Sequence, residues 1–228
     1  MYILGLTGSI GMGKSAAARM FRRLGVPVYD ADAAVHRLLA KGGAAVARVE
    51  AAFAGVVRDG AVDRRALGAH VFGRPDELRK LERILHPMVA LAQRRFLARA
   101  ARARRPLVVL DVPLLFESGG EARTDAIAVV SAPYRLQRAR VLARPGMTED
   151  KFAAVLRQQT PDPIKRQRAD FIIPTGLGFR NSLRRVAEIV TICSKREGRI
   201  WPPTRRPRRR PARHPSRRPL HARNRPRH

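Results

Sequence analysis

Short apolar runs recur along the chain, separated by segments in which apolar residues follow helical spacing. Five runs suit buried strands and lie at Tyr2–Thr7, Val26–Tyr29, Pro106–Asp111, Ala126–Ser131 and Phe171–Ile173. Continuous apolar runs of about four to eight residues are typical of parallel strands buried on both faces. Because such runs alternate with helical segments, the pattern predicts an α/β fold with a five-stranded parallel sheet flanked by helices.

The segments between these runs predict the helices. One helix follows the glycines near the N-terminus and ends at Gly25, and others are expected at 133–143, 148–157 and 180–195. The long segment between the second and third strands is rich in Ala, Leu and Arg at helical spacing, so it is expected to be a helical insertion. Its helical pattern is interrupted near Gly42–Gly43, Asp59–Gly60 and His86–Pro87.

The stretch GSIGMGKS, between the first strand and its helix, fits the P-loop pattern Gly8-x-x-x-x-Gly13-Lys14-Ser15. Gly8, Gly11 and Gly13 permit backbone angles and close approaches that a Cβ would block, so backbone N–H groups can surround a phosphate at a helix N-terminus. Lys14 is expected to reach the β- and γ-phosphates, and the Ser15 hydroxyl to bind Mg²⁺. The alternative is a glycine-rich turn with an accidental Lys-Ser pair.

Acidic residues follow two of the predicted strands. Asp30 and Asp32 come directly after the second strand, at the sheet edge where ligands of open α/β folds bind. One of them can orient or accept the proton of an attacking hydroxyl, or either can merely cap the next helix. Asp111 ends the third strand and resembles a Walker B acid that holds Mg²⁺, although aspartate is also common in turns after strands. Glu117, in PLLFE, can contact a ligand or pair with a neighbouring cation.

Gln137, Arg140 and Arg144 share one face of a predicted helix by i, i+3 and i+4 spacing. Such a basic face can simply be solvated. Here it precedes the turn-like segment Arg144-Pro145-Gly146-Met147. The functional alternative is therefore a lid whose arginines close over the phosphates of a nucleotide.

The composition narrows the class of protein. The chain has 228 residues, 45% of them apolar, and one cysteine, which excludes an internal disulfide. It carries no stretch of about 18 apolar residues that could span a bilayer and no basic signal-peptide start, so a cytoplasmic location is predicted. Of the net charge of +29, residues 199–228 contribute +12, all from arginine. With seven prolines and few apolar residues, this Arg/Pro-rich tail is expected to be disordered.

Together these segments resemble the dephospho-CoA kinase family. The matching elements are LTGSIGMGKS, VYDADAAVH, LHP, LDVPLLFE, the Gln137-x-x-Arg140-x-x-x-Arg144 pattern, Gln159, and RADFII followed by TGLG. They cover about residues 1–195. The P-loop alone indicates an NTPase or kinase, and the other segments narrow the resemblance to this family.

The resemblance implies a P-loop fold of the nucleoside monophosphate kinase type. It implies ATP-dependent phosphorylation of the ribose 3′-hydroxyl of dephospho-CoA, the last step of coenzyme A synthesis, with ATP and Mg²⁺ as cofactors. Asp32 is then the base or orienter of that hydroxyl, and Arg140 and Arg144 belong to the lid. The residues implied to hold ATP are Gly11, Met12, Gly13, Lys14, Ser15 and Ala16.

The predicted organisation is a kinase domain over 1–198 and a tail over 199–228. The core is expected at 1–32, 106–134 and 168–198, the acceptor-binding insertion at about 33–105 and the lid at about 135–167. Two residues depart from the family pattern: Ala16 stands where Thr is frequent, and Pro174 where Asn or Asp is usual.

Two other functions stay open at the level of sequence. One is a different kinase of the same fold with another small-molecule or nucleotide acceptor. The other is a nucleic-acid-binding protein that acts through its basic tail by salt-sensitive phosphate contacts. The tail can also be a frame-shifted translation of GC-rich DNA.

Overall fold

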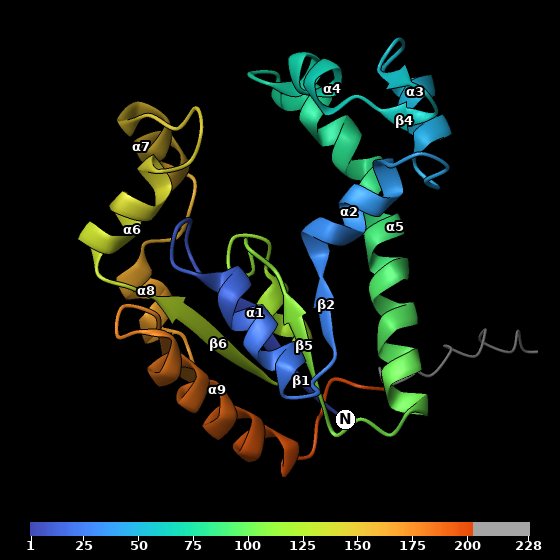
Figure 1. Ribbon diagram of the computed structural model, residues 1–228. Helices are drawn as coiled ribbons and strands as arrows, with labels where there is room; N and C mark the ends of the chain where they lie inside the picture. The colour runs from blue at the N-terminus through green and yellow to red at the C-terminus, as the bar shows by residue number, and fades with distance from the viewer. Residues whose placement is uncertain (203–228) are drawn as a thin grey trace, which may run out of the picture.

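The computed structural model describes residues 1–202, and its centre is a five-stranded parallel sheet in the order β2-β5-β1-β6-β7 (Figure 1). The strands are β1 (Tyr2–Thr7), β2 (Val28–Asp30), β5 (Leu107–Asp111), β6 (Ala126–Ser131) and β7 (Phe171–Pro174). All four pairings are parallel. The predicted strand number, orientation and approximate positions are confirmed.

Alternating residues of the strands face two layers of helices. On one face, Leu4 and Leu6 pack with α1 (Lys14–Arg23) and α9 (Phe179–Ser194). On the other face, Ile3 packs with the C-terminal part of α5 (Pro75–Arg102). Burial on both faces explains why the strands are apolar throughout rather than alternating.

The insertion after β2 forms a second hydrophobic core away from the sheet (Figure 1). Its elements are α2 (Ala31–Leu39), α3 (Val46–Ala52), β3 (Val57–Arg58), β4 (Ala61–Val62), α4 (Arg64–Val71) and the start of α5. The antiparallel hairpin β3–β4 was not predicted. Its turn, Asp59–Gly60, has φ of 51° and 78°, and positive φ at both positions is what a two-residue hairpin turn requires.

The predicted break at His86–Pro87 is wrong, because α5 runs through Pro87 for 28 residues. A proline inside a helix removes one hydrogen bond and crowds the preceding turn. Packing holds both halves in line: Leu81 and Leu85 are buried in the core of the insertion, and Leu97 is buried against the sheet. The helix, about 42 Å long at 1.5 Å per residue, therefore joins the two cores.

Three shorter helices follow β6: α6 (Tyr134–Leu142), α7 (Glu149–Arg157) and α8 (Asp162–Gln167). The 3₁₀ turn η1 (Gly120–Arg123) precedes that strand. In Figure 1, α6 and α7 rise on the opposite side of the sheet's carboxyl end from the insertion. No helix within residues 1–202 combines the length and apolar character needed to cross a membrane.

The first residues of the predicted tail differ from the expectation of disorder. Ile200 and Trp201 pack against the core formed by α5 and the sheet. Asp125 Oδ1 accepts hydrogen bonds from the backbone N–H groups of Arg199, at 2.6 Å, and Ile200, at 3.1 Å. These two apolar side chains find a surface that the local composition did not reveal. Residues 203–228, which carry most of the predicted tail, lie outside the described part of the chain.

Candidate active site

The P-loop connects β1 to α1 and has the backbone shape that its glycines predict. Gly11 and Gly13 have φ of 76° and 92°, in the left-handed region that favours glycine. A Cβ on Gly8 would lie 2.7 Å from the Val130 carbonyl oxygen, and one on Gly11 would lie 2.5 Å from Val141 Cγ2. Gly13 is the N-cap of α1 and supplies no capping side chain. The first N–H groups of this helix therefore have no side-chain cap from that residue, which suits an anion site at a helix N-terminus.

Two glutamines hold the P-loop from the side of α6 and α7. Gln137 is buried and donates from Nε2 to the Ile10 carbonyl at 2.8 Å. Gln159 accepts from the Ile10 N–H at 3.0 Å. Because both contacts fix the backbone of one residue, Gln137 and Gln159 position the loop, and neither role follows from the sequence pattern alone.

Arg140 lies over the same loop and is bound to protein. Its guanidinium donates to the Thr175 carbonyl at 2.8 Å and to Thr175 Oγ1 at 3.0 Å. Thr175 Oγ1 in turn donates to the Met12 carbonyl at 2.6 Å. Thr175 was not among the predicted site residues, and only its place in TGLG pointed to it. Arg144, one turn beyond Arg140, is exposed and has no ion-pair partner among residues 1–202.

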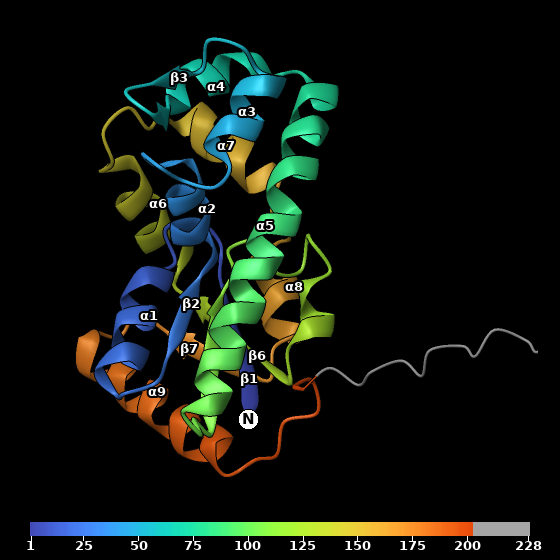
Figure 2. The ribbon, with the colours of Figure 1, turned by 90° about the vertical axis from the view of Figure 1, so that its right-hand side faces the viewer.

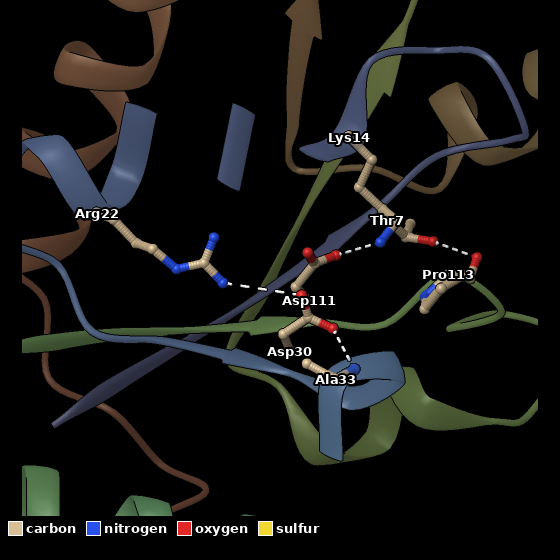
Figure 3. A network of polar contacts seen from close by, with 7 residues as sticks. All are labelled: Thr7, Lys14, Arg22, Asp30, Ala33, Asp111 and Pro113. Carbon is tan, nitrogen blue, oxygen red and sulfur yellow. Dashed lines mark hydrogen bonds and ion pairs between the residues drawn. The ribbon is translucent and has the colours of Figure 1, made fainter. Parts of the chain in front are cut away.

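Lys14, at the start of α1, and Asp111, at the end of β5, form the centre of the site (Figure 3). Lys14 Nζ lies 2.5 Å from Asp111 Oδ1, and Asp111 is only 3% exposed. Burial raises the pKa of the Asp111 carboxyl, the Lys14 charge opposes that rise, and the charges of Asp30 and Asp32 add to it. The β2–β5 register places Asp30 beside Asp111, and Asp32 follows in the first turn of α2.

The two aspartates after β2 have different surroundings. Asp30 caps α2 by accepting from the Ala33 N–H at 2.9 Å, and its other oxygen lies 3.9 Å from Arg22 (Figure 3). Asp32 lies in the first turn of α2, is exposed, and has no hydrogen-bond or ion-pair partner in the described chain. The question left open by the sequence is settled for Asp30, which caps the helix.

The PLLFE segment after β5 connects the core to the end of the predicted lid. Leu115 and Phe116 are buried, whereas Glu117 faces Lys165 with 2.9 Å between Oε1 and Nζ. Glu117 Oε1 also accepts from the Thr160 N–H at 2.7 Å. The Lys165 side chain is completely buried and has no well-aligned hydrogen-bond acceptor among residues 1–202, so Glu117 is its charge partner. Glu117 therefore pairs with a cation, one of its two predicted roles.

A cavity of about 710 Å³ adjoins the P-loop beneath α6 and α7. Its lining includes Met12, Gln137, Gln159, Pro174 and Leu177. It thus borders the P-loop, the predicted lid and the loop after β7. Cys193, by contrast, is buried against the sheet, where burial raises the pKa of its thiol to about 11, so it takes no part in this chemistry.

A family model described as dephospho-CoA kinase matches residues 2–177. The chain belongs to the dephospho-CoA kinase family. A dephospho-CoA kinase from Paramagnetospirillum magneticum is 69% identical over 166 residues, which make up 73% of this chain and 78% of that protein. Another, from Rhodospirillum rubrum, is 57% identical over 192 residues, or 83% and 90% of the two chains.

Solved structures agree with the fold of this dephospho-CoA kinase family member. The crystal structure of TT1252 from Thermus thermophilus superposes with a TM-score of 0.72 and 37% identity, over 84% of this chain and 96% of that one. Dephospho-CoA kinase from Campylobacter jejuni gives a TM-score of 0.58 at 21% identity, over 85% and 98%. The predicted family and P-loop kinase fold are confirmed.

Proposed function

We propose that this chain transfers the γ-phosphoryl group of ATP to the ribose 3′-hydroxyl of dephospho-CoA, giving coenzyme A and ADP. The observation that carries the proposal is one sheet edge that holds both a P-loop and Asp32, an exposed carboxylate with no partner among residues 1–202. Family membership supplies the acceptor, because the geometry alone is compatible with other hydroxyl acceptors.

The phosphates of ATP occupy the cradle formed by residues 11–16 at the start of α1. Lys14 exchanges Asp111 for the β- and γ-phosphates when the nucleotide binds, since both partners are anions within reach of its flexible side chain. Gly8 allows the loop to pack close to β6. Ala16 lies in the first turn of α1 and supplies no hydroxyl, and Ser15 provides the hydroxyl for the metal ion.

Mg²⁺ fits the residues of this edge. Mg²⁺ prefers oxygen ligands and takes most of them from substrate phosphates and water, so one or two protein oxygens at this edge suffice. The Ser15 hydroxyl and the Asp111 carboxylate are the oxygen donors that would hold it. When bound, the ion neutralises charge on the phosphate oxygens.

Asp32 orients the acceptor hydroxyl and takes its proton. The 3′-oxygen attacks the γ-phosphorus, and the bond from that phosphorus to the oxygen bridging the β-phosphate breaks. The hydroxyl proton passes to Asp32, so charge and atoms balance when ADP leaves. Positioning and charge neutralisation supply the catalysis.

Arg140 and Arg144 add positive charge from the lid. Arg144 is exposed and available to the γ-phosphoryl group, whereas Arg140 is already fixed over the loop by Thr175. The lid predicted at 135–167 is anchored to the core at Gln137, Gln159 and Lys165. Closure therefore moves α7 and the turn after Arg144 more than α6 or α8.

The Asp32→Asn variant tests the proposal. Loss of a general base lowers kcat by about 10²–10⁴-fold and leaves the KM for ATP within about threefold. ADP release is measured with dephospho-CoA and with a panel of other hydroxyl acceptors. The matched control is Asp59→Asn, in the hairpin turn of the insertion, where asparagine tolerates positive φ. An unchanged kcat in Asp32→Asn removes Asp32 from the mechanism. If the protein phosphorylates another hydroxyl compound and not dephospho-CoA, the proposed acceptor is wrong.

A further inference from the structure

A second cavity, of about 410 Å³, lies along the edge strand β2, where α1, α2 and α5 meet. Figure 2 shows β2 between α1 and α5, with α2 above it. Four arginines line this cavity: Arg22, Arg37, Arg95 and Arg99. None of the P-loop residues contributes to its lining, and neither do Asp32 and Asp111, so it is separate from the phosphate cradle.

The charge of this edge cavity is poorly compensated. Its one acidic residue is Asp30, which lies 3.9 Å from Arg22 and gives its other oxygen to the cap of α2. In the part of the chain that the structure describes, Arg37, Arg95 and Arg99 have no acidic partner within 4.0 Å. Several guanidinium groups around one hollow repel one another and attract anions.

The spacing of the arginines suits more than one phosphate group. Arg95 and Arg99 are one turn apart on α5, about 5–6 Å, and Arg37 faces them from the last turn of α2. Ala33 lies one turn before Arg37 on α2, and Ala92 lies one turn before Arg95 on α5. The small side chains of both alanines leave the cavity open. The planar fork of each guanidinium matches two phosphate oxygens.

The floor of the edge cavity is aromatic. Tyr29 and Phe96 line it with their ring centroids 5.5 Å apart. The Tyr29 hydroxyl donates to the Val89 carbonyl at 3.1 Å, which ties β2 to α5. Apolar rings beneath a ring of cations suit an organic group that carries phosphates.

We propose that the edge cavity is a second anion site that binds small compounds carrying a pyrophosphate group, outside the catalytic cleft. The site does not depend on the identity of the acceptor. Asp30 connects the edge cavity to the carboxyl edge of the sheet. Its carboxylate lies 3.9 Å from Arg22, which also lines the cavity (Figure 3).

Titration calorimetry with inorganic pyrophosphate tests the site on the full chain, after the P-loop is filled with a non-hydrolysable ATP analogue. The double variant Arg95→Gln/Arg99→Gln is compared with Arg94→Gln/Arg102→Gln. The control removes the same charge from exposed positions of the same helix that do not line the cavity. The expected result is saturable binding by the wild type and the control, and at least tenfold weaker binding by Arg95→Gln/Arg99→Gln.

A second variant covers the case in which the arginine variant does not fold. Ala92→Leu fills the hollow without changing charge and is expected to weaken pyrophosphate binding as well. Equal affinity in all variants, or no saturable binding by the wild type, overturns the proposal. No step of the test measures turnover, so it is independent of the proposed kinase activity.

Discussion

Asp30 and Asp32 are two positions apart, yet their surroundings give them different roles. Asp30 stabilises the start of α2 by capping it, which contributes about 1 kcal/mol. That cap fixes the first turn of the helix, and Asp32 lies in that turn without a partner among residues 1–202. A structural residue therefore positions the residue that we assign to the chemistry.

Asp111 illustrates how a site residue costs stability. Because burial raises the pKa of its carboxyl, the folded protein binds this proton more tightly than the unfolded chain does. The corresponding stability is present below the ordinary aspartate pKa of about 4 and is lost as the pH rises through the raised value. Asp111→Asn removes that loss, so we expect its Tm relative to the wild type to increase as the pH rises above about 4.

Thermal unfolding of both proteins across this pH range measures the effect. The change of the Tm difference with pH is decisive. Loss of the contact with Lys14 also changes the Tm of the variant, but it shifts the difference by a similar amount at every pH. A difference that stays flat or falls with rising pH contradicts the assigned shift. Kinase activity of the variant is expected to fall, since the residue assigned to Mg²⁺ loses its charge.

The segments that surround the P-loop act as one unit. Gln137 from α6 and Gln159 from the turn before α8 both bind the backbone of Ile10. Lys165 of α8 joins the same unit to the PLLFE segment through Glu117. The shape of the phosphate cradle therefore depends on elements more than a hundred residues away in the chain.

Glu117→Gln tests this connection. It leaves the Lys165 ammonium buried without its counter-charge, and breaking a buried pair in this way costs about 3–5 kcal/mol. For a domain of this size the Tm is expected to fall by about 6–20 °C. Thermal unfolding gives the value.

The matched control is Glu149→Gln, which breaks the exposed ion pair with Arg138 and is expected to cost about 1 kcal/mol or less. The double variant Glu117→Gln/Lys165→Met removes both charges and should recover part of the loss. Equal Tm values for Glu117→Gln and Glu149→Gln would show that Lys165 does not rely on Glu117.

At the scale of the whole molecule, α5 joins the hydrophobic packing around the sheet to the core of the insertion. The packing around the sheet involves the helices on both of its faces, and the insertion has a core of its own. The end of the described chain returns to the sheet core, where Ile200 and Trp201 pack beside residues of α5. Residues 199–202 thus belong to the folded domain, although the composition groups them with the arginine-rich segment.

Two truncations separate these parts. A chain ending at Pro202 retains every residue assigned to the site and should keep the kcat and Tm of the full protein. A chain ending at Gly198 loses the burial of Ile200 and Trp201, about 2 kcal/mol, and its Tm should be about 4–8 °C lower. Equal Tm values for the two truncations contradict the packing role of these residues.

Binding to double-stranded DNA at two salt concentrations compares the full chain with the chain ending at Pro202. Salt-sensitive retention only by the full chain assigns nucleic-acid binding to residues 203–228. Loss of kinase activity on removal of these residues would show that they are required for catalysis.

The sequence predicted what depends on local chemistry. The five apolar runs became the sheet, and the spacing of Gly8, Gly13, Lys14 and Ser15 predicted the P-loop, because each needs only neighbouring residues to be recognised. The order of the motifs also predicted the family. The predicted break at Pro87 was wrong because the tendency of proline to end a helix was outweighed by the packing of Leu85 and Leu97 in two different cores.

Only the tertiary structure decided which distant groups meet. Asp111 contacts Lys14, 97 positions away, and Thr175 links Arg140 to the Met12 carbonyl of the P-loop. The edge cavity likewise combines arginines from three helices. Such contacts depend on strand register and helix packing, and a residue pattern along the chain carries no information on the distance between side chains that folding brings together.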